Sequence, residues 1–144
     1  MESFVGRAGA KVHVLRFDPG DLLLEGIHEY LARNNIKNGY VLSGVATLSH
    51  CVLHMVMTTG FPPVEHFRTW DNKPLEVAGL SGVIADGLAH LHVIVSDHDT
   101  AVAGHVEPGC RILYRGEVVI QELEGVNLTR KKNSQGIEML SQKM

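Results

Sequence analysis

The sequence predicts an α+β domain, with a largely antiparallel sheet of about six or seven strands and one long helix. Three observations lead to this fold class. One early segment has the three- and four-residue apolar spacing of an amphipathic helix. Most later apolar segments are short and alternate with polar residues, as strands do. After residue 36 no steady alternation of strand and helix follows, which favours an antiparallel sheet over a doubly wound parallel one.

The first two predicted elements are a strand and the long helix. Residues 11–17 alternate valines with longer side chains and are expected to form the strand. The run Asp18-Pro19-Gly20-Asp21 then offers a helix start, with Asp18 as the N-cap and Pro19 as the first helical residue. The helix is expected to end at Asn34-Asn35, and its apolar stripe consists of Leu23, Leu24, Ile27, Tyr30 and Leu31.

The central part is predicted to hold strands around one irregular stretch. Residues 40–43 and 48–57 are expected to be strands, with a bend or bulge at Gly44 between them. Residues 60–74 contain three prolines and are expected to be the longest irregular segment, a kind that often carries function or lies at an interface. Two further strands are predicted, at residues 75–84 and 88–96.

The last third of the chain is predicted to contain less regular structure. A helical turn, the second short helix of the fold, is expected at residues 108–113, and a last strand at 117–123. Residues 126–144 are interpreted as a solvated tail with a short basic run, Arg130, Lys131 and Lys132. We therefore expect a single domain over residues 1–144, with its core at about 7–125.

Composition narrows the classes of function. A chain of 144 residues with 44% hydrophobic residues can build one core without disulfides or a structural metal. Thirteen Lys and Arg oppose sixteen Asp and Glu, and this net charge of −3 argues against a protein that mainly coats nucleic acid. There is no apolar run near the ~20 residues of a membrane span, no signal-peptide pattern and no cysteine framework. A cytoplasmic protein without membrane association is therefore expected.

The histidines form the pattern with the clearest chemistry. In a strand over residues 88–96, His90 and His92 share one face, with their Cα atoms about 6–7 Å apart. After a polar turn, a neighbouring strand would return His105 beside them. Three neutral imidazoles suit a divalent metal, Zn²⁺ above Fe, Ni or Cu, and leave a position open for another ligand. The metal site is therefore predicted at His90, His92 and His105, with possible supporting partners at Asp97, Asp99 and Glu107.

Other interpretations of these residues stay open at this point. A His-x-His pair alone more often indicates a polar face of a strand. With the third histidine, the spacing is equally consistent with a metal site and with a polar face. His50 and His54 lie four apart in an apolar run and are predicted to pack in the core or an interface, with His54 a minor ligand candidate. Cys110 is interpreted as a small buried residue. No role is proposed for the remaining histidines singled out, which are His13, His28, His66 and His98.

Taken in order, several segments resemble the PPC domain, a domain conserved in plants and prokaryotes. The resemblance covers about residues 7–140. It rests on Arg16 to Asp21 leading into a helix, Gly39 to Gly44, Gly82, His90-Leu91-His92, Asp97, Gly104-His105 and the strand at Glu117. It implies an α+β homotrimer in which the histidines matching His90, His92 and His105 form a metal site in prokaryotic members. The doubled glycine frequent before the third histidine is Ala103-Gly104 here.

Two functions from different classes follow. The first is a metal-binding homotrimer whose three-histidine site binds or processes a small molecule, with residues 60–74 of the same or a neighbouring subunit as a pocket wall. The second is a trimeric protein-interaction or DNA-associated regulatory scaffold without catalysis. The AT-hook segments of plant relatives are absent, so direct nucleic-acid binding is not expected. A cupin-type oxygenase fits less well, because Asp97 lies five residues after His92 and a long helix comes early.

Overall fold

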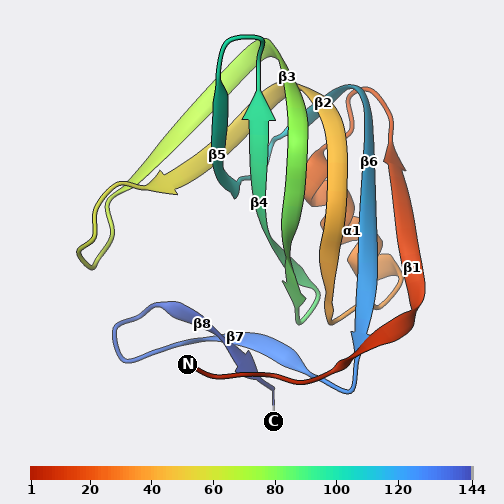
Figure 1. The fold of residues 1–144 in the computed structure, drawn as a ribbon, viewed down its shortest axis with the longest axis vertical. Helices are drawn as coiled ribbons and strands as arrows, with labels where there is room; N and C mark the ends of the chain where they lie inside the picture. The colour runs from red at the N-terminus through yellow and green to blue at the C-terminus, as the bar shows by residue number, and fades with distance from the viewer. Residues whose placement is uncertain (144) are drawn as a thin grey trace.

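The structure is a computed structural model that describes residues 1–143, and these form eight strands and one helix (Figure 1). Six strands make one antiparallel sheet in the order β1-β6-β2-β3-β4-β5. Their bounds are β1 Arg7–Phe17, β2 Gly39–Val56, β3 Glu65–Ala85, β4 Leu88–Ser96, β5 Ala101–Val106 and β6 Arg111–Glu124. A separate hairpin consists of β7 (Leu128–Lys132) and β8 (Glu138–Gln142). The α+β class is confirmed, with the sheet dominant.

The sheet curls until β5 pairs with a second neighbour. On one side β5 pairs with β4, where His105 lies opposite His92. On its other side β5 pairs with the end of β2, where His105 lies opposite His54. The strands β2, β3, β4 and β5 thereby close on one another. Hydrogen bonding on both sides fixes β5, and with it the backbone of His105, between histidines from two other strands.

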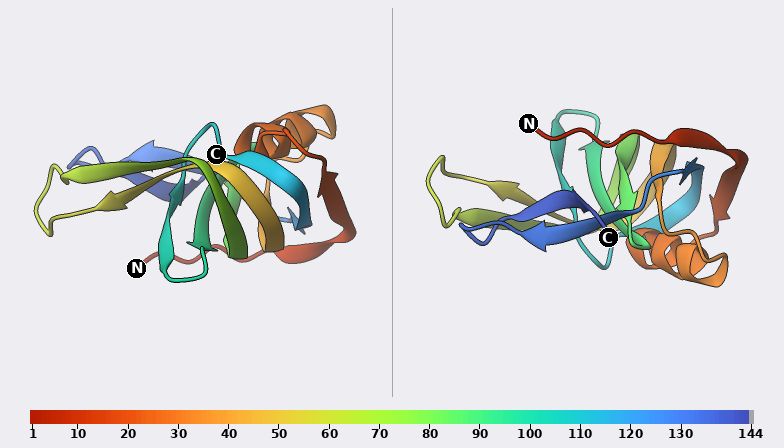
Figure 2. Two further views of the ribbon diagram at one scale, coloured as in Figure 1. Left: turned by 90° about the horizontal axis from the view of Figure 1, so that it is seen from above. Right: turned by 90° about the horizontal axis from the view of Figure 1, so that it is seen from below.

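The helix α1 (Leu23–Arg33) lies against one face of the sheet (Figure 2). The four aliphatic residues of its predicted apolar stripe are buried and Tyr30 is partly buried. The stripe meets a sheet core that includes Leu48, Leu53, Ile84, Leu91, Ile112 and Ile120. Full burial of each such side chain stabilises the fold by about 1.5–3 kcal/mol. With 11 residues, α1 is shorter than predicted, and no helix among residues 1–143 is long and apolar enough to span a bilayer.

The helix also begins later than the sequence predicted. Asp18 is not its N-cap, because residues 18–21 form a turn in which the Asp21 N–H donates to the Asp18 carbonyl at 3.1 Å. Leu22 occupies the N-cap position without a side-chain hydrogen bond. The Leu23 N–H instead donates to the Cys110 carbonyl at 2.8 Å. The Cys110 carbonyl, one residue before β6, thus accepts a hydrogen bond at the start of the helix, where a capping side chain would otherwise do so. A tertiary contact therefore overrides the helix start predicted at Asp18.

The central strands are longer than predicted. The strands expected at 40–43 and 48–57 are one strand, β2, whose ladder is irregular between Val41 and Ser43, next to the predicted bend. The expectation of an irregular segment over 60–74 is wrong, since β3 begins at Glu65. Pro74 is tolerated in β3 because it lies at a register shift of the β2–β3 ladder, where no N–H from it is required.

The C-terminal third differs most from the prediction. The helical turn expected at 108–113 is wrong, because β6 already begins at Arg111 and is much longer than the predicted strand at 117–123. The predicted solvated tail is instead the β7–β8 hairpin, which lies below the end of the main sheet in Figure 1. Leu128 anchors it with only 4% of its surface exposed, and the Lys143 ammonium lies 2.7 Å from an Asp86 carboxylate oxygen.

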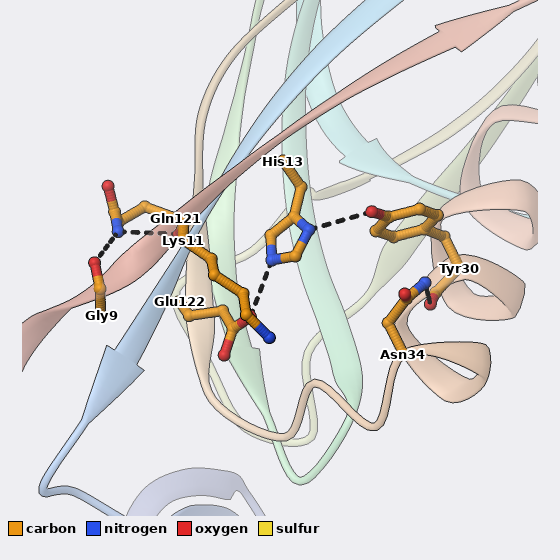
Figure 3. A network of polar contacts seen from close by, with 7 residues as sticks. All are labelled: Gly9, Lys11, His13, Tyr30, Asn34, Gln121 and Glu122. Atoms are coloured by element: carbon orange, nitrogen blue, oxygen red, sulfur yellow. Dashed lines mark hydrogen bonds and ion pairs between the residues drawn. The ribbon is translucent and has the colours of Figure 1, made fainter.

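A polar network ties the helix to the edge of the sheet (Figure 3). His13 of β1 points between the Tyr30 hydroxyl, 2.9 Å from Nδ1, and the Glu122 carboxylate, 2.8 Å from Nε2. Beside it, the Gln121 amide donates to the Gly9 carbonyl at 2.7 Å, at the irregularity in the β1–β6 ladder. The network satisfies the polar groups of α1, β1 and β6 where these elements meet.

Candidate metal centre

Three histidines gather on the β4–β5 ribbon, the antiparallel pair formed by β4 and β5. The side chains of His90 and His92 stand on the same face of β4, and their rings are stacked with centroids 5.4 Å apart. His105 pairs with His92 across the ribbon, and its ring meets the other two edge to face. Its centroid lies 4.7 Å from that of His90 and 5.5 Å from that of His92. The structure therefore brings together all three residues of the predicted site.

The spacing of the ring nitrogens suits a small cation. One nitrogen from each of the three rings lies within 4.8 Å of the other two. The Nε2 atoms of His90 and His92 are 3.4 Å apart. Two nitrogens bound to one tetrahedral zinc ion at about 2.0–2.1 Å lie about 3.3 Å from each other. The donor set and the separation of the His90 and His92 nitrogens therefore fit the ion that the sequence predicts, with a nitrogen of His105 in the same cluster.

The opposite face of the ribbon holds the three rings in place. Leu91, Val93 and Val95 alternate with the histidines along β4 and are at most 3% exposed. Beside β4 in the sheet, Gly82 of β3 pairs with Leu91 so closely that a Cβ at Gly82 would lie 1.9 Å from the His90 carbonyl oxygen. A side chain at this position would displace the backbone of His90. The glycine thus allows the close approach of β3 that positions the first histidine.

A second pair of polar side chains adjoins His105. His54 of β2 lies beside it, with ring centroids 4.5 Å apart. The Nδ1–H of His54 donates to the Glu107 carboxylate at 2.6 Å, and the same carboxylate oxygen lies 4.0 Å from Nε2 of His105. His54, predicted to pack in the core or an interface and to be a minor ligand candidate, is partly buried at the edge of the site. Glu107 is the predicted supporting residue that reaches it.

The environment of the site favours uncharged imidazoles. Burial first, and then the neighbouring histidines, hold the pKa of His105 at about 4, although Glu107 opposes the shift. Burial also lowers the pKa of His90, and the positive charge of Arg130 adds to that effect. Both rings are therefore neutral near pH 7, which is the state in which imidazole binds a metal ion.

The other two supporting residues predicted from the sequence lie elsewhere. Asp97 caps the β4–β5 turn, where its carboxylate accepts hydrogen bonds from the Asp99 and Thr100 N–H groups at 2.9 and 2.8 Å. It also forms an ion pair with Lys73, and these contacts lower the pKa of Asp97. Asp99 is exposed and pairs with His98 at 3.1 Å. Both carboxylates stabilise the turn that joins the strands rather than the histidines.

The remaining histidines and the cysteines have structural contacts. His28 accepts a hydrogen bond from the Ala89 N–H at 3.1 Å, and His50 pairs with Asp71 at 2.8 Å. Cys110 is buried, as predicted, and its sulfur lies 4.0 Å from that of the buried Cys51. Of these groups, His28 lies beside the three-histidine cluster, since it lines the same depression as His90 and His105.

Beside the site lies a shallow depression of about 290 Å³ that the sequence did not predict. Its wall includes His90, His105 and Glu107, together with Arg130 of β7 and Glu138 of β8. No residue of 60–74, the predicted pocket wall, lines it within this chain. The nearest sequence signal was the basic run at Arg130, but nothing in its local pattern indicated which part of the sheet it would meet.

Comparison with known proteins agrees with the fold and the resemblance drawn from the sequence. The family model of the Plants and Prokaryotes Conserved (PCC) domain matches residues 6–124. Among solved structures, a metal-containing protein from Archaeoglobus fulgidus has a TM-score of 0.83 at 22% identity, covering 99% of this chain and all of that one. A plant- and prokaryote-conserved protein from Pyrococcus horikoshii has a TM-score of 0.82 at 18% identity, covering 100% and 99%. At these identities the structures show the fold alone.

The chain is also similar to two proteins that carry different names. A protein from Bacteroides thetaiotaomicron, named as a candidate DNA-binding protein, has a TM-score of 0.79 at 17% identity and covers 95% of this chain and 96% of its own. The bifunctional protein GlmU of a Synechococcus strain is 30% identical over 122 residues, or 84% of this chain. The chain spans only 18% of the length of that relative.

Proposed function

The chain belongs to the Plants and Prokaryotes Conserved domain family, and we propose that it binds one divalent metal ion, zinc, through His90, His92 and His105. The observation that carries this proposal is the 3.4 Å separation of two Nε2 atoms, with the third ring edge-on to both. Burial lowers the pKa of His90 and His105, so both rings are neutral near pH 7 and can each offer a nitrogen lone pair to an ion.

The site would take a small molecule as an additional ligand of the ion. Three protein ligands leave one position of a tetrahedral ion open, and both His90 and His92 face solvent rather than the core. A zinc ion bound by these three histidines would supply Lewis-acid chemistry to an oxygen atom of the ligand. Glu107 would orient the imidazole of His54 beside His105 through the hydrogen bond from Nδ1.

The metal content of the purified protein tests the site. Elemental analysis is expected to find about one divalent ion per chain, and His92→Ala is expected to lose it. His66→Ala is the matched control, because His66 is an exposed histidine of β3 that belongs to none of the candidate metal-binding groups among residues 1–143. Full metal retention in a variant with all three histidines replaced by alanine would refute the proposal.

We further propose that the chain forms a homotrimer. The observation in support is an arm that projects from the body of the molecule (Figure 1). It consists of the end of β2, the start of β3 and the loop between them. This arm exposes five large apolar side chains that water solvates poorly: Val56, Met57, Phe61, Val64 and Phe67. An interface between copies would cover them, and residues 60–64 at its tip would then lie against a neighbouring subunit.

Sedimentation equilibrium tests the assembly. The native chain is expected at three times its own mass, and Phe67→Asp is expected to shift the distribution toward monomer. Leu88→Asp is the control, because Leu88 is equally exposed but lies at the start of β4, away from the arm. A monomeric native chain would contradict the trimer.

The second candidate function is a protein-interaction or DNA-associated scaffold without catalysis. The same exposed arm favours it, because an apolar surface of this kind also suits a different protein. The two functions differ in their need for the ion. A scaffold would keep its partner in the His92→Ala variant, whereas a small-molecule site would lose its ligand.

A further inference from the structure

The C-terminal hairpin brings a positive charge to the edge of the metal centre. Arg130 lies on β7, outside the residues matched by the family model. Its guanidinium donates to the Val83 carbonyl at 3.2 Å and, at a longer 3.5 Å, to the Leu88 carbonyl. Val83 is the residue of β3 that pairs with His90, and Leu88 precedes His90 on the same face of β4. The two carbonyls therefore hold Arg130 next to the first predicted metal ligand.

The guanidinium of Arg130 has more hydrogen-bond donors than the two carbonyls use. It is partly buried, and among residues 1–143 its charge has no carboxylate within 4.0 Å. Glu138 lines the same depression without forming an ion pair with it. An arginine carries five N–H donors in a planar fork that matches the oxygens of a carboxylate or phosphate. Two donors meet the carbonyls, so the rest are available to a ligand.

We propose that Arg130 makes the site selective for small anions, with one oxygen of a carboxylate or phosphate on the ion and another on the guanidinium. This inference rests on the proposed function, because the ion supplies the positive charge that outweighs Glu107 and Glu138. The depression of about 290 Å³ is at the small end of ligand sites, so it admits a ligand of few atoms. Sequence-independent binding to the phosphate backbone of DNA is disfavoured, because the chain has a net charge of −3.

The test titrates inorganic phosphate and acetate into the full chain loaded with Co²⁺, whose visible spectrum reports the ligands of the ion. Arg130→Gln is compared with Lys131→Gln, which removes the same charge from the next, exposed residue of β7. Phosphate is expected to bind the native chain and Lys131→Gln alike, and Arg130→Gln at least about tenfold more weakly. Co²⁺ binding itself is expected to be equal in all three proteins.

The outcomes separate the two proposals. If all three proteins bind Co²⁺ and neither anion changes the spectrum, or both variants bind phosphate equally, the anion inference is overturned while the metal site stands. If the native chain binds no Co²⁺, both are overturned. Arg130-dependent binding of duplex DNA without binding of either small anion would also contradict a small-molecule site.

Discussion

The β4–β5 ribbon and the β7–β8 hairpin meet at the candidate site, but the fold holds them in different ways. The ribbon lies inside a closed set of four strands, and its inner face is part of the main core. The hairpin pairs only with itself, and within residues 126–143 only Leu128 is a buried apolar residue. Its other attachments are polar, among them the contacts of Arg130 and Lys143.

The difference separates two tasks within one site. The proposed metal ligands need fixed positions, and they lie on strands that are paired along both sides within the main sheet. The charge proposed to select the ligand lies on an element with few buried contacts, whose local opening is expected to cost little free energy. Four experiments test this difference between the ribbon and the hairpin.

Replacing Gly82 by alanine is expected to disrupt the ribbon. The added Cβ would lie 1.9 Å from the His90 carbonyl oxygen, a backbone atom that cannot rotate away. We expect a loss of at least about 4 kcal/mol in the free energy of unfolding, measured by urea titration, and loss of bound metal. Gly79→Ala, where a Cβ meets nothing within 4 Å, is expected to leave both quantities nearly unchanged.

The same truncation made in both regions compares their packing directly. Leu91 of the ribbon is 1% exposed and Leu128 of the hairpin is 4% exposed. We expect Leu91→Ala to cost about 3 kcal/mol and Leu128→Ala about 2 kcal/mol, because the hairpin can open locally without unfolding the sheet. Urea titration measures both, and hydrogen exchange is expected to show faster exchange confined to residues 126–143 in Leu128→Ala. A larger loss for Leu128 would reverse the comparison.

Lowering the pH is expected to weaken the ribbon of the metal-free protein. The pKa of His105 is about 4 in the fold and 6.5 ordinarily, so between these values the unfolded chain binds more protons. The stability contributed by neutral His105 is therefore complete above about pH 6.5 and falls as the pH approaches 4. We expect about 1–2 kcal/mol after allowance for solvent screening.

Urea titrations with a chelator at pH 7.5 and 4.5 measure this loss. His105→Asn is expected to show a smaller difference between the two pH values than the native chain. His98→Asn, which changes an exposed histidine of the turn, is expected to keep the native difference. Equal pH dependence in all three proteins would show that His105 does not titrate in this way.

Removing the ion pair at the end of the hairpin is expected to have the smallest effect. Lys143 contacts both carboxylate oxygens of Asp86, at 2.7 and 2.8 Å, and this contact lowers the pKa of the Asp86 carboxyl. The pair is exposed to solvent, so Lys143→Gln should hardly change the unfolding midpoint. Hydrogen exchange is expected to speed up in β8 alone. Any change in metal content would mean that the hairpin supports the ribbon more than its contacts indicate.

Local patterns predicted part of the fold and most of the site. The stripe of α1 and its end at Asn34 were confirmed, because a helical period specifies which residues face the core. The alternation over residues 88–96 correctly put His90 and His92 on one face. The start of α1 and the length of β3 were predicted wrongly, since each depends on contacts with a strand distant in the sequence.

Which side chains share a face follows from the sequence alone, because strand and helix periods are properties of the local backbone. The sequence thereby specified the three histidines and a loop short enough to return the third one. Two features of the site depend on tertiary contacts. The strand β5 also pairs with β2, which adds His54 and Glu107, and the C-terminal hairpin brings Arg130 next to His90. These contacts join residues about 40 to 50 positions apart, where pairing depends on the packing of the whole sheet rather than on any local period.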